Sequence, residues 1–365
     1  MKWINEVLAA LAGYFKFSSI SDKGVVVYFE GTQDVPHLLP IVNCLKQRNQ
    51  QVTVVASEEM SEIDHIFIGS GFFRILFFQL LDCEIILMTM PDLERLHIKR
   101  SKNPVKYAYV FHSLSSSHTI YHEEAFDAYD IIFAAGKHHV TEIEKREKLK
   151  NIKSKNIIEG GYPRIDSIIS SMPDTLPTSD TITIAPTWGS GSLLEHEKNM
   201  DILKAFIDTG YHICLRIHPM TKRHHPQLIE NLKKSFGSKK RFSIVENMSD
   251  KSSLYESFMM VSDWSGAAFD FSFTQKRPVL FINTPQKINN PNFQEMELPA
   301  AEDEVRNHLG RVVELEDLSN VKSIVDEFRH NKEEWKKRIE QLDNEFVFNL
   351  GCSAEKIASE IMRLK

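Results

Sequence analysis

The sequence predicts an α/β protein with two consecutive open units, each a parallel β-sheet covered by helices on both faces. From Lys23 onward, short apolar runs rich in β-branched and aromatic residues alternate with helical patterns. These runs are apolar on both faces, which is typical of strands buried in a parallel sheet. The alternation stops at residues 170–181, SSMPDTLPTSDT, and then restarts. A stretch rich in Pro, Ser and Thr is typical of a linker.

Composition narrows the class of protein. The chain has 365 residues, of which 42% are hydrophobic and 26% charged, as in a globular protein of two domains. A net charge of -6 argues against a dedicated nucleic-acid binder. Because Asn5 and Glu6 interrupt the apolar N-terminal segment, no secretory signal is predicted. The cysteines are far apart and in no metal-binding spacing, which predicts reduced residues of a cytoplasmic protein; they are Cys44, Cys83, Cys214 and Cys352.

The predicted first unit spans residues 21–172 and the second spans 182–320, with a linker at 173–181. The strands expected in the first unit are Val25–Phe29, Gln51–Val55, His65–Ile68, Glu84–Thr89, Lys106–Phe111, Asp130–Ala134 and Asn156–Glu159. Those expected in the second are Thr181–Pro186, His212–Ile217, Phe242–Val245, Phe258–Val261, Pro278–Ile282 and Arg311–Leu315. Charged amphipathic patterns predict only helices over residues 321–365.

Residues 1–20 predict an amphipathic N-terminal helix. Its apolar face would carry Trp3, Ile4, Val7, Leu8, Leu11, Tyr14 and Phe15. Such a stripe lies in a membrane interface or docks on the first unit. We favour docking, because the charge on the polar face is mixed. The apolar segment 66–90 is interrupted by charges, and no uninterrupted run in it approaches the roughly 20 residues needed to cross a bilayer. It predicts a buried helix at Gly71–Leu81, with an exposed membrane-facing patch as the alternative.

The turn Ser262–Gly266 is a candidate phosphate site. It follows the apolar run Phe258–Val261 and precedes a helical pattern that includes Asp270. A hydroxyl-rich turn between a parallel strand and a helix presents backbone N–H groups and the positive helix end to one point. The alternative is an ordinary N-cap, since Ser and Asp are common there.

Other polar residues follow predicted strands of both units. They are His112, Ser113, Gly161, Tyr162 and Arg164 in the first unit, and Pro186, Thr187, Arg216 and His218 in the second. Ligands of open α/β sheets bind beyond the carboxyl ends of strands, so two facing units would form a cleft lined by these loops. His112 and His218 each end an apolar strand on one side of that cleft. The remaining histidines in polar surroundings are interpreted as structural or surface residues; they are His118, His122, His138, His139, His224 and His225.

Five short motifs, in order, resemble the CDP-glycerol glycerophosphotransferase family of teichoic-acid and capsule synthesis. They are GYPRID (161–166), APTW (185–188), RIHPM (216–220), SDWSGAAFD (262–270) and RPVLF (277–281). The resemblance covers roughly residues 105–315. It implies a GT-B fold, in which two Rossmann-like domains have parallel sheets that face each other across a cleft. The acceptor would bind to the first domain and the donor nucleotide to the second. The C-terminal helices would cross back to the first domain.

The resemblance also implies roles for individual residues. It places His112 as the general base for the acceptor hydroxyl and His218 at the donor phosphates. The phosphate turn corresponds to Ser262, Asp263, Ser265 and Gly266, and an acidic position of the family corresponds to Asp270. The other residues expected on the donor side are Pro186, Thr187 and Arg216. The remaining residues expected in the cleft are Ser113, Gly161, Tyr162 and Arg164. The chain differs from the family pattern at FHSLSSSH, where Trp and Gly usually flank the histidine, and at Gly266, where a second serine is usual.

The implied reaction moves glycerol phosphate, or another polyol phosphate, from a CDP-activated donor to a surface glycan or lipid-linked precursor. The donor, CDP-glycerol or a related cytidine nucleotide, is then a substrate, and no cofactor is expected. No Asp-x-Asp pair occurs, which favours a metal-independent mechanism with no metal site. Two alternatives stay open: a GT-B glycosyltransferase that uses a CMP- or UDP-sugar, and a nucleotide-binding protein without turnover. The expected location is the cytoplasm, either free or peripheral on the inner face of the cell membrane, with no nucleic-acid partner.

Overall fold

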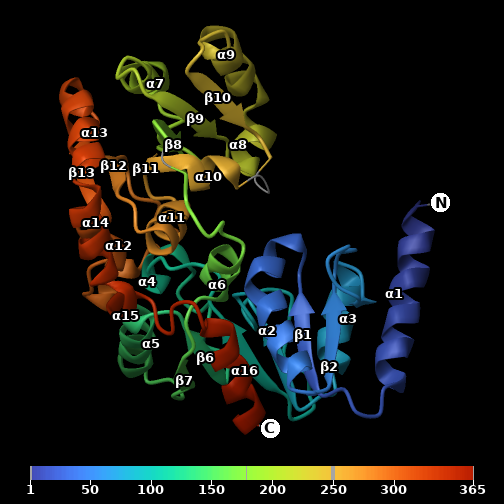
Figure 1. Cartoon of the computed structure of the whole chain (residues 1–365). Helices are drawn as coiled ribbons and strands as arrows, with labels where there is room; N and C mark the ends of the chain where they lie inside the picture. The colour runs from blue at the N-terminus through green and yellow to red at the C-terminus, as the bar shows by residue number, and fades with distance from the viewer. Residues whose placement is uncertain (1, 178, 248–250, 365) are drawn as a thin grey trace. The chain divides into compact units, whose positions relative to one another are not determined.

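The computed structural model describes residues 2–177, 179–247 and 251–364 (Figure 1). The chain divides into two compact units. The first unit consists of Met1–Ser170, Asn289–Leu298 and Asn344–Lys365, and the second of Ser171–Ile288 and Pro299–Asp343. Part of the predicted linker, residue 178, lies outside the described residues.

The first unit contains a parallel sheet in the order β3-β2-β1-β4-β5-β6-β7. Its strands are β1 (Val25–Phe29), β2 (Val52–Ala56), β3 (Ile66–Phe67), β4 (Ile85–Met88), β5 (Lys106–Val110), β6 (Ile131–Ala134) and β7 (Asn156–Glu159). Its helices are α1 (Lys2–Ser19), η1 (Thr32–Asp34), α2 (Val35–Gln47), α3 (Phe72–Leu80), α4 (Ser117–Ile120), α5 (Lys137–Lys150), α6 (Pro163–Ser170), η2 (Phe293–Met296) and α16 (Ser353–Leu364). The short helix α15 (Asp343–Phe346) begins at the unit boundary.

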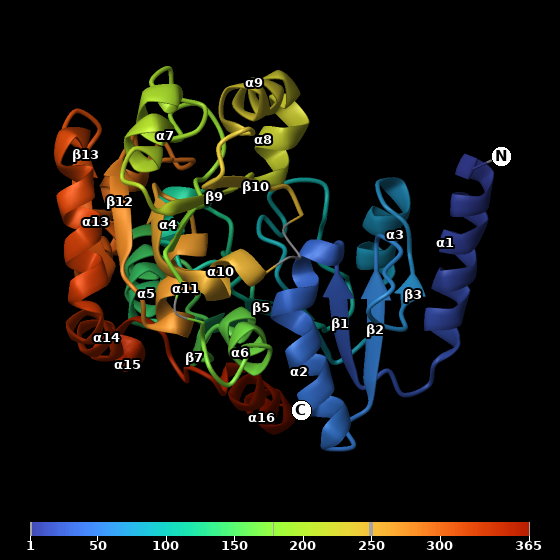
Figure 2. The ribbon, with the colours of Figure 1, turned by 45° about the horizontal axis from the view of Figure 1, so that its top comes forward.

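Side chains from both faces of this sheet are buried. Val25, Val27 and Phe29 of β1 point to one face and pack in a core with residues of α2 and α16. Figure 2 shows α2, α6 and α16 side by side. On the other face, the ring of Tyr28 makes an edge contact with Phe78 of α3 at 5.0 Å between centroids. Burial on both faces explains why the strands are continuous apolar runs in the sequence.

The second unit repeats this topology in a parallel sheet of order β10-β9-β8-β11-β12-β13. Its strands are β8 (Thr181–Ile184), β9 (His212–Arg216), β10 (Phe242–Val245), β11 (Ser257–Ser262), β12 (Val279–Asn283) and β13 (Gly310–Glu314). Its helices are α7 (Asn199–Ile207), α8 (Pro219–His224), α9 (Pro226–Phe236), α10 (Ser252–Glu256), α11 (Ala267–Gln275), α12 (Ala301–Leu309), η3 (Leu318–Asn320), α13 (Val321–His330) and α14 (Lys332–Glu340). A second core joins β8, β9 and β11 to α7, α9 and α13.

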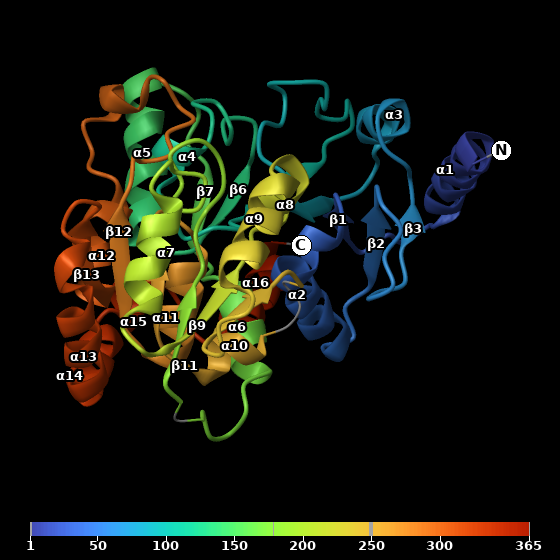
Figure 3. The same cartoon turned by 90° about the horizontal axis from the view of Figure 1, so that it is seen from above.

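Helix α1 packs on the first unit through a face of small residues. Ala10, Gly13 and Phe17 are buried, and Figure 3 shows α1 next to β3 at the edge of the sheet. Gly13 permits this close approach, because an added Cβ would lie 1.8 Å from the carbonyl oxygen of Phe67. Docking was predicted, but residues of the predicted stripe remain exposed: Ile4, Leu8, Leu11 and Phe15. The side chain of Trp3 lies outside the described residues.

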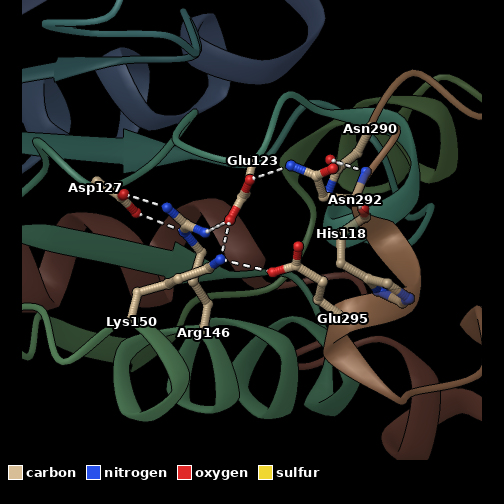
Figure 4. A network of polar contacts seen from close by, with 8 residues as sticks. All are labelled: His118, Glu123, Asp127, Arg146, Lys150, Asn290, Asn292 and Glu295. Atoms are coloured by element: carbon tan, nitrogen blue, oxygen red, sulfur yellow. Dashed lines mark hydrogen bonds and ion pairs between the residues drawn. The ribbon is translucent and has the colours of Figure 1, made fainter.

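The segment Asn289–Leu298, which is flanked in sequence by the second unit, is anchored to the first by polar contacts (Figure 4). Asn290 Nδ2 donates to the carbonyl oxygen of His118 at 2.9 Å, and Asn292 Nδ2 donates to Glu123 at 2.8 Å. Lys150 Nζ bridges Glu123 and Glu295 at 2.8 and 2.7 Å. The buried His118 ring lies between Glu142 and the carbonyl oxygen of Leu298, at 3.2 Å from each, which is the structural role expected for it.

The structure confirms the predicted α/β class with two parallel sheets. Every predicted strand is present, with both ends within two residues of the prediction. The helix predicted at Gly71–Leu81 is α3, although it buries Phe77 and Phe78 and leaves Phe72 and Leu80 exposed. Within residues 2–177, 179–247 and 251–364, no helix has the length and apolar character that crossing a bilayer requires.

Candidate functional site

Both sheets have a Rossmann-type strand order. Folds of this type bind ligands beyond the carboxyl ends of the strands, at the point where the strand order reverses. In the first unit this point lies between β1 and β4, and in the second between β8 and β11. His112 follows β5, the strand next to β4. His218 follows β9, the strand next to β8. Each predicted catalytic histidine is therefore at the strand end where its own unit should bind a ligand.

The side chain of His112 is held by groups from neighbouring strand ends. Its Nδ1 atom lies 3.0 Å from the carbonyl oxygen of Thr89, which follows β4, and 3.1 Å from the Tyr109 hydroxyl. Its Nε2 atom lies 3.3 Å from the hydroxyl of Tyr121. A carbonyl oxygen only accepts hydrogen bonds, so Nδ1 carries the proton in the neutral ring. Nε2 then carries the lone pair and accepts a hydrogen bond from the Tyr121 hydroxyl.

The environment of His112 favours the neutral, basic form of its ring. Burial lowers the pKa of His112 below its usual value of 6.5, although the hydrogen bond to Thr89 and the charge of Glu30 oppose this shift. The hydroxyl of Thr89 in turn donates to Asp34 Oδ1 at 2.9 Å. A neutral imidazole with a fixed tautomer and a lone pair on Nε2 is the chemistry of a general base.

Three predicted residues of the first unit, Ser113, Gly161 and Tyr162, lie in loops near His112, and a fourth, Arg164, lies on α6. Tyr162 is buried and donates from its hydroxyl to the carbonyl oxygen of His112 at 3.1 Å. Gly161 has φ +93°, and an added Cβ would lie 2.3 Å from the carbonyl oxygen of Phe348, so glycine is required there. Ser113 is half-buried and accepts from the backbone N–H of Ser115 at 3.1 Å. Arg164 is half-buried on α6.

In the second unit, the residues of the predicted phosphate turn differ in exposure. Ser262 is fully buried, and its hydroxyl donates to the carbonyl oxygen of Ala185 at 2.8 Å. Asp263 is buried and accepts from the backbone N–H groups of Thr187 and Leu193 at 2.7 and 2.9 Å. Those contacts tie the loop after β8 to the loop after β11. Ser265 is half-buried and Gly266 is exposed, so this part of the turn is accessible to a ligand.

His218 lies beside an aromatic and a cationic side chain. Its Nδ1 accepts from the backbone N–H of Met220 at 3.1 Å, so the proton of the neutral ring is on Nε2. The Trp188 ring stacks on it with 6.1 Å between centroids, and Lys287 Nζ lies 4.0 Å from the centre of that Trp188 ring. Burial and the charge of Lys287 lower the pKa of His218. Burial also lowers the pKa of Lys287.

Three other predicted donor-side residues are buried. Arg216 is buried on β9, and its Nη1 donates to the hydroxyl of Ser253 on α10 at 2.8 Å. Pro186 is buried two residues after the end of β8, and Asp270 is buried on α11. The half-buried Thr187 contributes its backbone N–H to the bond with Asp263. These positions leave four predicted donor-side residues with solvent access: Thr187, His218, Ser265 and Gly266.

Sequence reasoning missed several residues of these two regions. Thr89 and Tyr121 hold the two ring nitrogens of His112. Lys287 supplies a cation next to Trp188 and His218. The buried Arg306 stacks its guanidinium on Trp264 at 3.9 Å, and burial lowers its pKa to about 10. No motif marks these residues, because each comes from a different strand end or helix. Across the described parts of the chain, no three His, Cys, Asp or Glu side chains are grouped as metal ligands.

Two doubly wound parallel-sheet units in succession define a GT-B-like protein, here with a predicted catalytic histidine at the ligand-binding end of each sheet. Residues 101–362 match the family described as CDP-Glycerol:Poly(glycerophosphate) glycerophosphotransferase. The match spans more than half of the chain, and this protein therefore belongs to that family of transferases. The resemblance seen in the five motifs is confirmed. A search among curated protein sequences gave no significant match.

Solved structures of similar fold include a wall teichoic acid polymerase and a putative UDP-N-acetylglucosamine 2-epimerase. The wall teichoic acid polymerase TagF superposes with a TM-score of 0.60 at 16% identity, over 98% of this chain and 92% of TagF. A putative UDP-N-acetylglucosamine 2-epimerase from Listeria monocytogenes gives a TM-score of 0.67 at 13% identity, over 94% and 96% of the two chains. The S. aureus MnaA-UDP complex gives 0.65 at 14% identity, over 94% and 98%. At these identities the likeness establishes the fold alone.

Proposed function

We propose that this protein transfers glycerol phosphate, or another polyol phosphate, from a CDP-activated donor to a hydroxyl of a surface glycan or its lipid-linked precursor. The family match over residues 101–362 is the observation on which this rests. A further structure of similar fold is TagF H444N soaked with CDPG, at 15% identity and a TM-score of 0.59 over 99% and 97% of the two chains. It supports CDP-glycerol as the donor.

The reaction needs a base for the acceptor hydroxyl and fixed hydrogen-bond donors for the phosphates of the CDP substrate. The acceptor oxygen attacks the phosphorus that carries glycerol, the bond from that phosphorus to the bridging oxygen breaks, and CMP leaves. His112 Nε2 takes the acceptor proton in this proposal, at the position where the Tyr121 hydroxyl now donates. The N–H on Nε2 of His218 donates to a phosphate oxygen. Ser265, Gly266 and Lys287 stabilise the negative charge that grows on CMP.

The donor assignment predicts selective stabilisation by a cytidine nucleotide. CDP at ten times its Kd should stabilise the folded protein by about 1.4 kcal/mol, which raises Tm by about 3–6 °C for a domain of roughly 200 residues. ADP at the same concentration should raise Tm much less. Differential scanning fluorimetry measures both shifts. Equal shifts with CDP and ADP would contradict the cytidine assignment, and a larger shift with UDP would favour the glycosyltransferase alternative.

The exposed apolar side chains of α1 and α3 support a second part of the proposal, binding to a membrane surface that holds a lipid-linked acceptor. Leu8 and Phe15 of α1 are 59% and 68% exposed, and Phe72 of the adjacent α3 is 69% exposed. The two helices pack together through Phe17 and Phe77, whose rings make an edge contact at 4.9 Å. Two adjacent helices of the first unit thus expose large apolar side chains to solvent.

Replacing Leu8 and Phe15 together with glutamate should weaken membrane binding without unfolding the protein, because both side chains are exposed. Burial of one large apolar side chain contributes about 1.5–3 kcal/mol, so the partition coefficient should fall at least about tenfold. Cosedimentation with phosphatidylglycerol–phosphatidylethanolamine vesicles measures this. Leu149→Glu, at a 46% exposed position of α5, is the control and should bind as the wild type does. Unchanged binding of the double variant would rule out this surface.

A further inference from the structure

His37 is a second histidine at the ligand-binding end of the first sheet. It lies in α2, which follows β1 and the short helix η1. The strands β1, β4 and β5 are adjacent in the sheet, because β1 pairs with β4 and β4 with β5. The segments that follow these three strands contain His37, Thr89 and His112, respectively. The His37 ring makes an edge contact with His112, with 6.1 Å between centroids, and a tilted contact with Tyr162 at 5.4 Å. The strand order therefore places His37 at the reversal point that the first unit offers a ligand.

The hydrogen bonds of the fold do not account for this residue. His37 is only 6% exposed, and its Nδ1 atom is buried with no hydrogen-bond partner among the described residues. The carboxylate of Asp34, one turn earlier in the chain, is already engaged by the backbone N–H groups of Glu30 and Gly31 and by the Thr89 hydroxyl. A buried polar atom without a partner destabilises a protein by about 1–3 kcal/mol. Such an atom next to a candidate base points to a ligand contact.

The charge state of His37 indicates which ligand group it suits. Burial and, after it, the positive charge of Arg164 hold the pKa of His37 well below 6.5, so its ring is neutral. A neutral imidazole donates one hydrogen bond and accepts another. A hydroxyl does the same, whereas a phosphate or carboxylate oxygen only accepts and pairs better with the neighbouring Arg164. The ring therefore matches an alcohol.

We propose that His37 binds a second hydroxyl of the acceptor, adjacent to the one that attacks, and so selects acceptors that end in a polyol. His112 then acts on the attacking hydroxyl, and its edge contact with His37 keeps the two rings on neighbouring oxygens of one glycerol unit. This inference rests on the proposed function. It assigns His37 to substrate selection and leaves proton transfer to His112.

The variant His37→Phe tests the inference, because phenylalanine retains the ring contacts and removes both nitrogens. Two acceptors are compared, one ending in glycerol phosphate and one in 3-hydroxypropyl phosphate, which lacks the middle hydroxyl. Wild-type kcat/KM should be about tenfold higher for the glycerol terminus, the effect of one hydrogen bond. In His37→Phe this preference should fall to about twofold or less, mainly through KM, with the value for the hydroxypropyl acceptor retained. His37→Gln, which keeps a donor and an acceptor, should restore part of the preference.

His212→Phe, at a half-buried histidine of β9, is the matched control and should keep the wild-type preference. An equal loss on both acceptors in His37→Phe would assign His37 a packing role only, and no change on either would exclude contact with the acceptor. Both results would overturn the inference, whereas activity of the wild-type enzyme on either acceptor separately tests the proposed function.

A binding measurement further separates the inference about His37 from the proposed function. In ¹H–¹³C spectra, the imidazole Cε1–H signal that is missing from His37→Phe should shift in the wild type on addition of glycerol phosphate and much less with 3-hydroxypropyl phosphate. This readout requires no turnover. Absence of the shift would overturn the inference even for an active enzyme, and its presence in an inactive one would retain the site while rejecting the proposed reaction.

Discussion

Replacing His112 with alanine should lower kcat at least about a hundredfold while leaving the affinity for the CDP donor nearly unchanged. A positioned general base contributes about 10²–10⁴-fold to the rate, and alanine removes it. The donor affinity should survive, because His112 belongs to the first unit and the donor-side residues belong to the second. Steady-state kinetics with varied donor, together with the Tm shift caused by CDP, measure the two quantities separately.

The pH dependence of the wild-type enzyme checks the same assignment. His112 must be deprotonated to act as a base, and burial lowers its pKa below 6.5. The rate should therefore be constant around neutral pH and fall only as the pH drops below 6.5, through the lowered pKa. His112→Ala should lose this acidic limb.

The exposed His122, ten residues further along the same unit, provides the matched control. His122→Ala should retain turnover and the acidic limb. Turnover of His112→Ala near the wild-type value would mean that another residue is the base.

Replacing His218 with alanine should impair use of the donor itself, with kcat/KM for the donor reduced about 10²–10³-fold. In other enzymes, loss of one fixed hydrogen-bond donor to a developing oxyanion has an effect of this size. The bond from the Met220 N–H to Nδ1 fixes the proton on Nε2, so the ring has one N–H to offer a phosphate. The Tm shift caused by CDP should shrink in His218→Ala and persist in His112→Ala.

His218→Gln should recover part of the activity, because its amide can supply an N–H. His308→Ala, at an exposed position of α12 in the same unit, should resemble the wild type. A His218→Ala enzyme with a full CDP shift and normal kcat/KM would exclude this histidine from the donor site.

The sequence predicts the sheets well because their physical signal is local. Strands buried on both faces must be apolar at every position, as in Val25–Phe29, and turn residues separate them from helices. The same reasoning finds His112 and His218, since a polar residue that ends an apolar strand is visible in the sequence. The predicted family follows from short motifs at those strand ends.

Other features depend on contacts between distant segments, which no local pattern encodes. Helix α1 docks through Ala10, Gly13 and Phe17, because Gly13 allows the backbones to approach, whereas its apolar periodicity marks the opposite, exposed face. His37 lies within a helical pattern, and its unpaired nitrogen becomes evident only when its neighbours are placed. The roles of Thr89, Tyr121 and Lys287 are likewise defined by tertiary structure.

The most direct test of the proposed activity is product analysis after incubation with CDP-glycerol and a glycerol phosphate-terminated lipid acceptor. Mass spectrometry should show the acceptor extended by one or more glycerol phosphate units, with one CMP released for each unit added, and His112→Ala should form at least about a hundredfold less product. An unchanged acceptor in the presence of CDP-glycerol, together with sugar transfer from a CMP- or UDP-sugar to the same or another acceptor, would contradict the glycerophosphotransferase assignment.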